Sequence, residues 1–86
     1  MTYFIEQQHS GEECLKALDE LAERGPSLLD KSYLACNAGE HRGYAFVEAG
    51  SEYEAREMVP TALREQARVI RVDRFTPEQI RSFHQK

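Results

Sequence analysis

Three helix-start signals divide this chain, and they constrain its fold more than any other feature of the sequence. Each signal pairs a hydroxyl residue with an acid or amide three positions later, and the pairs are Ser10–Glu13, Ser51–Glu54 and Thr76–Gln79. In such a pair the hydroxyl accepts a hydrogen bond from a free backbone N–H, and the longer side chain returns to the cap. Runs rich in β-forming residues stand before and between these signals, so strands and helices must alternate along the chain.

The runs between the signals predict the fold class. Strands are expected over residues 2–9, 33–36, 43–49 and 69–75, with a helix after each cap. We expect one further helical turn over residues 27–31, and Pro60 should kink or split the second helix near residue 59. The order β-α-β-β-α-β plus a short C-terminal helix predicts an α+β, ferredoxin-like fold. Such a fold has a four-stranded antiparallel sheet with two helices on one face.

The size and composition of the chain predict a single domain over residues 1–86. The chain is 41% hydrophobic and 30% charged, and no apolar run approaches the ~20 residues that a membrane span needs. The first residues do not resemble a signal peptide, and two cysteines do not make a disulfide scaffold. We therefore expect a reduced, cytoplasmic protein with no membrane partner. The net charge of −4 argues against non-specific binding to nucleic acid.

The predicted topology brings three ligand-type side chains to one end of the sheet. His9 ends the first strand, Cys36 ends the second and His41 lies in the hairpin turn. Thiolate and imidazole suit zinc, nickel or copper, so these residues form a candidate metal site, with a fourth ligand from Glu40, water or a partner chain. Two alternatives stay open. Cys36 and His41 are a small core residue and a solvated turn residue, or Cys36 is a nucleophile activated by His41 or His9.

The other cysteine, Cys14, falls in the first predicted helix. It stands four residues before Leu18, on the stripe of apolar residues that this helix is expected to bury, which are Cys14, Leu15, Leu18, Leu21 and Ala22. A cysteine at such a position behaves as a small hydrophobic residue, so Cys14 is predicted to be inert core.

Alternation along the strands divides the sheet into two faces. The face beneath the helices is assigned Ile5, Ala45, Val47, Ile70 and Val72. The open face then combines aromatic and charged side chains, which are Phe4, Glu6, Gln8, Tyr44, Phe46, Glu48, Arg71 and Asp73. An exposed face of this kind is typical of a ligand-binding surface or of an interface with a second copy. The candidate ligand-binding residues are Phe4, Glu6, Tyr44, Phe46, Glu48 and Arg71.

One segment of this face resembles the strand-three octamer of RNA-recognition motifs. Residues 42–49, Arg-Gly-Tyr-Ala-Phe-Val-Glu-Ala, follow the pattern Lys/Arg-Gly-Phe/Tyr-Gly/Ala-Phe-Val-x-Phe/Tyr except at Ala49. Phe4 falls where the aromatic residue of the strand-one motif stands. The resemblance implies that single-stranded RNA stacks on Phe4, Tyr44 and Phe46. Negative charge on the same face, and on the chain as a whole, weighs against this function.

A second resemblance covers residues 39–60. The Gly-x-His turn at residues 39–41, the aromatic strand after it and the Ser51-capped helix reaching Pro60 are similar to part of the dimeric α+β-barrel proteins, such as muconolactone isomerases. The resemblance implies a homodimer in which two open sheet faces pair into a barrel with a ligand cavity. It also implies that the chain from Phe75 onward crosses to the partner.

Three functions are therefore open for the chain. The first is a homodimeric protein that binds a small molecule or a transition metal near His9, Cys36 and His41. The second is a single-stranded RNA-binding module. The third is a small isomerase- or oxygenase-like enzyme that uses the open-face carboxylates as general bases. No catalytic motif assigns residues to this last function, so catalytic activity is left undecided.

Overall fold

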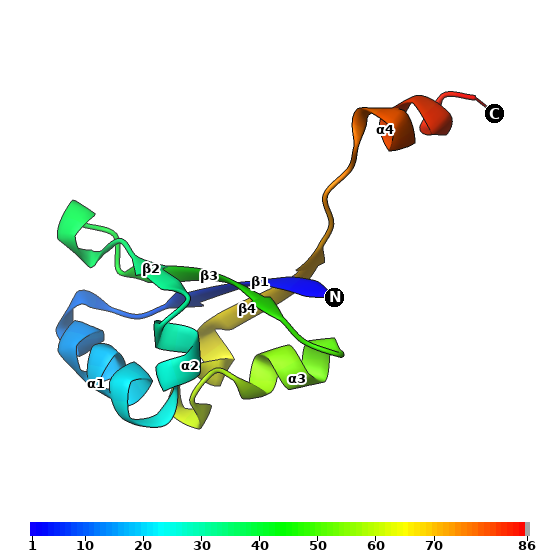
Figure 1. The fold of residues 1–86 in the computed structure, drawn as a ribbon. Helices are drawn as coiled ribbons and strands as arrows, with labels where there is room; N and C mark the ends of the chain where they lie inside the picture. The colour runs from blue at the N-terminus through cyan, green and yellow to red at the C-terminus, as the bar shows by residue number, and fades with distance from the viewer. Residues whose placement is uncertain (86) are drawn as a thin grey trace.

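Strands and helices alternate along the chain as the three helix-start signals predict. The structure, a computed structural model that describes residues 1–85, contains one four-stranded sheet with helices packed against one of its faces (Figure 1). In chain order the elements are β1 (Thr2–Gln8), the 3₁₀ turn η1 (Gly11–Glu13), α1 (Cys14–Arg24), α2 (Pro26–Leu29), β2 (Ser32–Leu34), the 3₁₀ turn η2 (Cys36–Ala38), β3 (Arg42–Glu48), α3 (Glu52–Glu57), the 3₁₀ helix η3 (Thr61–Gln66), β4 (Ala67–Val72) and α4 (Pro77–Phe83). The α+β class is confirmed.

The sheet is antiparallel throughout, with its strands in the order β2-β3-β1-β4. β1 is a central strand, and Ile5 lies between Ala45 of β3 and Val69 of β4. β3 separates β2 from β1, so the end of β1 and the β2–β3 connection meet at one end of the sheet. This arrangement is compatible with a ferredoxin-like fold.

The helix caps form as their sequence signals predict. In all three, the cap hydroxyl accepts a hydrogen bond from the backbone N–H three residues later, in the pairs Ser10–Glu13, Ser51–Glu54 and Thr76–Gln79. At Thr76 the reciprocal bond is also present, because its N–H donates to the Gln79 side chain at 2.8 Å. The expected break at Pro60 is confirmed, since α3 ends at Glu57 and η3 begins at Thr61.

The core lies between the sheet and the layer formed by α1, α2 and α3 (Figure 1). Its fully buried side chains come from both layers and include Ile5, Leu21, Leu28, Val47 and Val59. The buried stripe of α1 runs through Ala17 and Leu21, whereas Leu15 is exposed. The stripe predicted for this helix is therefore wrong at Leu15, and the face turned to the sheet contains positions 14, 17, 18 and 21.

One polar side chain, Gln7, is buried on the helix-covered face of β1. It is 2% exposed, and neither its oxygen nor its nitrogen has a hydrogen-bond partner within residues 1–85. Gln7 lies opposite Gly43, where a Cβ would come within 3.0 Å of Gln7 Nε2 and 2.7 Å of Leu34 Cδ2. Glycine is therefore required at position 43 to leave room for these two side chains.

The face predicted for the hydrophobic residues of β4 is wrong. Cross-strand partners share a side of the sheet, and Ile70 is the partner of Phe4 on the open face. Val69 is the residue that is buried beneath the helices. The sequence carries little information here, because Val69, Ile70 and Val72 are all apolar and do not alternate with polar residues.

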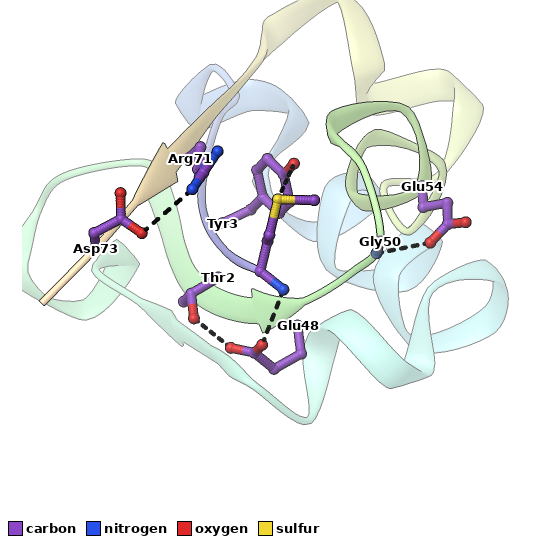
Figure 2. A network of polar contacts seen from close by, with 8 residues as sticks. Thr2, Tyr3, Glu48, Gly50, Glu54, Arg71 and Asp73 are labelled. Atoms are coloured by element: carbon purple, nitrogen blue, oxygen red, sulfur yellow. Dashed lines mark hydrogen bonds and ion pairs between the residues drawn. The ribbon is translucent and has the colours of Figure 1, made fainter.

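Arg71 is consequently on the side of the sheet opposite to the one predicted. It is the cross-strand partner of Tyr3, whose ring is buried on the helix side. At the end of the sheet its guanidinium group pairs with Asp73 at 3.9 Å (Figure 2). Arg71 therefore does not share a surface with Phe4, as the set of candidate ligand-binding residues requires.

The last helix, α4, stands apart from the rest of the molecule (Figure 1). Residues 73–76 lead away from the end of β4 without regular structure, and all of residues 73–85 are exposed. None of the helices within residues 1–85 is long and apolar enough to cross a membrane.

Candidate metal centre

The two histidines of the candidate site are brought together by the register of the central strands. Gln8 is paired with Arg42 across β1 and β3, so the next pair in the same register is His9 and His41. The pairing continues through the main chain, because the His9 N–H donates to the His41 carbonyl at 3.1 Å. The two imidazole rings lie 5.5 Å apart between centroids. His9 is 5% exposed and His41 is half-buried.

The two cysteines reach the same place from different elements. The β1–α1 connection turns through η1, so Cys14, the first residue of α1, faces the end of β1. β2 ends at Leu34, earlier than predicted, and Cys36 begins η2 instead of ending the strand. The Cys14 thiol donates to Cys36 Sγ at 3.3 Å, and Cys36 Sγ lies 3.5 Å from His9 Nε2.

The four side chains form a compact cluster, which we call the His/Cys cluster. One ligand atom from each of His9, Cys14, Cys36 and His41 can be chosen so that all four lie within 4.8 Å of one another. Such a group can hold a metal ion. The three residues predicted from the sequence are brought together, whereas Glu40, the suggested fourth ligand, is exposed and is not part of the group.

Cys14 is the member of the His/Cys cluster that sequence reasoning missed. The prediction that Cys14 lies in the core is wrong, because it is half-buried at the start of α1 and contacts Cys36. A signal was nevertheless present in the sequence. Cys14 shares the spacing of Ala17 and Leu21, so it must face the sheet, and it follows His9 by five residues across one short turn.

The protonation of the His/Cys cluster follows from its burial and its own neighbours. Burial and the adjacent His41 ring lower the pKa of His9, and the Glu13 carboxylate partly opposes this. A neutral imidazole is the form that binds a metal. The hydrogen bond with Cys36, followed by burial and the charge of the Cys36 sulfur, raises the pKa of the Cys14 thiol. A metal cation reverses this second effect, since a coordinating thiol loses its proton.

Two further observations fit a cation at this position. The Nδ1 atom of His41 is buried and has no hydrogen-bond partner within residues 1–85, although buried polar atoms are usually paired. The Nδ1 atom of His9 is also unpaired, but in His9 it is Nε2 that faces Cys36. The chain also passes very close to one ring, because a Cβ on Gly11 would lie 3.2 Å from His41 Nε2. The absence of a side chain at position 11 therefore leaves His41 free to turn toward the cysteines.

The nucleophile alternative is less well supported by this geometry. Cys36 and His9 are close enough to act as a thiol and base pair. A catalytic histidine is normally oriented by a third group on its other ring nitrogen. Within the described residues, His9 Nδ1 has no such partner.

On the open face, the aromatic residues predicted from the sequence do lie together. The ring of Phe4 is 6.1 Å from that of Tyr44 and 5.3 Å from that of Phe46. Glu6 lies beside them and pairs with Arg42 and with Arg68. The aromatic rings on this surface could stack with bases, but the acidic Glu6 lies among them. RNA binding therefore stays a prediction.

Glu48, at the other end of this face, lacks the raised pKa that proton transfer near neutral pH requires. A groove of about 740 Å³ reaches Glu48 and Asp73. Glu48 accepts a hydrogen bond from the Thr2 hydroxyl and pairs with the N-terminal amine at 3.5 Å (Figure 2). The hydrogen bond from Thr2 lowers the pKa of Glu48 most, and the charge of the N-terminal amine lowers it further. A general base near neutral pH needs a raised pKa, so this geometry does not favour the enzyme function.

Comparisons with known proteins add no identity to this geometry. No family model matches the chain, and neither a curated protein nor a solved structure matches it. The function must therefore be argued from the His/Cys cluster and its surroundings.

Proposed function

We propose that this protein binds one transition-metal ion, with zinc preferred, through the thiolates of Cys14 and Cys36 and the imidazoles of His9 and His41. The observation that carries the proposal is the convergence of four soft or borderline ligand atoms within 4.8 Å of one another. These atoms come from two short segments, residues 9–14 and 36–41, that are far apart in the sequence. Two thiolates with two imidazoles make one of the donor sets that hold structural zinc.

The distances within the His/Cys cluster support a tetrahedral ion. Zinc–sulfur and zinc–nitrogen bond lengths place two bound sulfurs about 3.8 Å apart, and a sulfur and a nitrogen about 3.6 Å apart. The corresponding separations are 3.3 Å between Cys14 and Cys36 and 3.5 Å between Cys36 and His9. These two pairs therefore need shifts of about half an ångström or less, which side-chain rotation at half-buried cysteines can supply. The other pairs start within 4.8 Å.

The proposed site is closed, with four ligands from the protein. Closed sites serve structure or storage, whereas catalytic zinc sites keep one position for water or substrate. The ion would join the end of β1, the start of α1 and the β2–β3 connection. Its role on this proposal is to fix these segments together and to hold the metal, without a catalytic step.

The proposal is tested by titrating the reduced protein with Co²⁺ and then displacing it with Zn²⁺. A tetrahedral site with two thiolates gives visible d–d bands and a thiolate-to-cobalt charge-transfer band, both of which zinc removes at one equivalent per chain. Cys14→Ser and Cys36→Ser should each weaken zinc binding about 100-fold or more, because each removes one of four covalent-strength contacts.

The matched control is His84→Asn, which removes an exposed histidine from α4, outside the His/Cys cluster. His9→Asn and His41→Asn should lose the cobalt spectrum, and His84→Asn should retain it. An unchanged zinc affinity in Cys14→Ser would overturn the four-ligand site. Failure of the wild-type protein to bind Co²⁺, Zn²⁺, Ni²⁺ or Cu⁺ more tightly than the Cys36→Ser variant would overturn the function as a whole.

We also propose that the fold is of the ferredoxin-like, split βαβ type. The strand order β2-β3-β1-β4 and the placement of α1 and α3 on one face support this proposal. An experimental structure with a different strand order or with helices on both faces would contradict it.

A further inference from the structure

The C-terminal arm, residues 73–85, is a structured segment that has nothing to pack against in its own chain. Its helix α4 is only seven residues long, far below the ~12–15 residues at which an isolated helix becomes marginally stable in water. The sequence nevertheless specifies it fully, with a capping box, proline at the first turn, Glu78 near its start and Arg81 near its end. A helix with such complete local signals and no burial is typical of a segment that packs on another molecule.

One side of the arm is apolar. Phe75 and Phe83 meet edge to face, with ring centroids 5.5 Å apart, and Ile80 completes this side. All three side chains are exposed, Phe83 by 55%. Phe75 and Ile80 occupy the two positions of a hydrophobic staple, so the apolar side is set by the geometry of the helix start. Three adjacent large apolar groups in solvent mark a surface that is meant to be covered.

The open face of the sheet is the second uncovered surface of the same chain. The helices α1, α2 and α3 all lie on the opposite side (Figure 1), and on the open face Phe4 and Tyr44 are half-buried beside the exposed Phe46. Phe46 is 63% exposed. Ile70 extends this apolar surface onto β4, from whose end the arm departs.

We propose that the protein is a homodimer in which the arm of each chain packs its Phe75, Ile80 and Phe83 side on the open sheet face of the other. This proposal is independent of metal binding. In this dimer the apolar side of one chain's arm covers the open face of the other chain. A two-fold axis makes the same contact twice, so both uncovered surfaces are covered in both chains.

The size of the sheet supports an interface that includes the arm. β1 and β3 have seven residues each, β4 has six and β2 has three, so the sheet makes a face of roughly 360 Å² when flat. Stable interfaces bury about 800 Å² on each partner. Two sheet faces alone would fall short of this area, whereas an arm from each chain adds a second contact region beyond the sheet.

The arm carries no net charge, so it can approach the acidic surface of a second chain without net repulsion. Residues 73–85 carry two carboxylates, Asp73 and Glu78, and two guanidinium groups, Arg74 and Arg81. The arm is therefore neutral, although the chain as a whole has a net charge of −4. A neutral arm adds no repulsion, and its arginines can approach exposed carboxylates such as Glu48, whose side chain is 74% exposed on the open face.

The test measures molar mass against concentration, by sedimentation equilibrium, for the full chain and three variants. Phe83→Glu changes the arm, Phe46→Glu changes the sheet face, and Tyr53→Glu is the control, because Tyr53 is 71% exposed on α3, on the other side of the molecule. We expect a wild-type dimer, an unchanged Tyr53→Glu dimer, and a dissociation constant raised about 30-fold or more by each of the other two changes.

Mixing the two disruptive variants separates arm exchange from other dimers. A heterodimer of Phe83→Glu with Phe46→Glu retains one intact contact, from the unchanged arm of the second chain to the unchanged face of the first. It should therefore form at concentrations at which neither variant dimerises alone. A dimer that ignores Phe83→Glu, or a mixture that shows no complementation, would overturn arm exchange.

A monomeric wild-type chain would also overturn the proposal. Folding of the arm onto the sheet of its own chain predicts that outcome, and so does an open face reserved for single-stranded RNA. Adding a single-stranded oligonucleotide to the monomer, with Phe46→Glu as the matched variant, would then distinguish the two. Because all variants are exposed substitutions, their circular dichroism and thermal unfolding show directly whether each one is folded.

Discussion

The two ends of the sheet present opposite kinds of side chain. At the end that follows β1, the polar groups of His9, Cys14, Cys36 and His41 are gathered and largely withdrawn from water. At the end that follows β4, the apolar groups of the arm are held out in water. Burial of polar atoms without partners costs free energy, and so does exposure of contiguous apolar area. The two proposals above account for this difference: an ion would occupy the His/Cys end, and a second chain would cover the arm end.

The largest expected effect is the stabilisation of the His/Cys end by zinc. At a free zinc concentration about 1,000 times the dissociation constant, binding to the folded state alone should add about 4 kcal/mol, or roughly 20 °C in Tm. Differential scanning fluorimetry of reduced protein with zinc, and then with excess chelator, measures this change. A Tm that does not respond to zinc would remove the distinction between the two ends.

The next effect concerns the arm end. If α4 is stable only when it packs on a second chain, its amides should lose protection from hydrogen exchange when the protein is diluted below the dimer dissociation constant. We expect a change of about tenfold or more for residues 78–83, because a seven-residue helix cannot persist alone. Exchange measured by mass spectrometry at two concentrations gives the answer, with β1 as the internal reference. Equal protection at both concentrations would show that the arm does not depend on a partner.

A smaller effect sharpens the account of the His/Cys cluster. Gly11→Ala places a methyl group 3.2 Å from His41 Nε2 and so restricts the ring without removing a ligand. Zinc affinity should fall about tenfold, as for other changes that disturb ligand orientation. The control is Gly50→Ala, whose added methyl group meets only the flexible end of Glu54 at the other end of the sheet. Equal affinities in the two variants would show that His41 does not need this freedom.

The smallest effect is on the pH dependence of the free energy of unfolding, which should differ between the two ends of the metal-free protein. The pKa of His9, which faces His41 and Glu13, is lowered from its usual value of 6.5. The contribution of His9 to the free energy of unfolding is therefore full above pH 6.5 and is lost as the pH falls below it. The pKa of Glu48, which faces Thr2 and the N-terminal amine, is lowered from 4.5, so its contribution is lost only below that pH. Urea unfolding across this range should show two separate declines. His9→Gln should remove the first, and Glu48→Gln should remove the second.

The parts of this molecule that sequence reasoning predicts well are governed by local chemistry. Ser10, Ser51 and Thr76 cap helices because the hydroxyl and the N–H it accepts from are three residues apart, and Pro60 breaks a helix because it lacks a donor. Strand order followed from the sequence of elements, which allows few connections. His9 and His41 were predicted to meet for the same reason.

The parts that were missed depend on register and phase between elements. The side of β4 that faces the helices is set by the pairing of Phe4 with Ile70, and a run of apolar residues does not reveal it. The predicted stripe of α1 included Cys14 but was wrong at Leu15, and helical spacing does not reveal that Cys14 meets the end of β1 and Cys36. The exposed position of α4 has no local signal at all, because its caps and apolar spacing would be the same in a packed helix.

The main-chain hydrogen bond between His9 and His41 has a consequence for how the chain folds. The two imidazoles lie at facing positions one residue beyond the paired ends of β1 and β3, so a slip of one residue between these strands would turn one ring to the opposite side of the sheet. An ion that needs both rings can bind only when these two strands are correctly aligned. During folding, the metal would thus stabilise only the native register of the two central strands, because a shifted register could not bind the ion through both histidines.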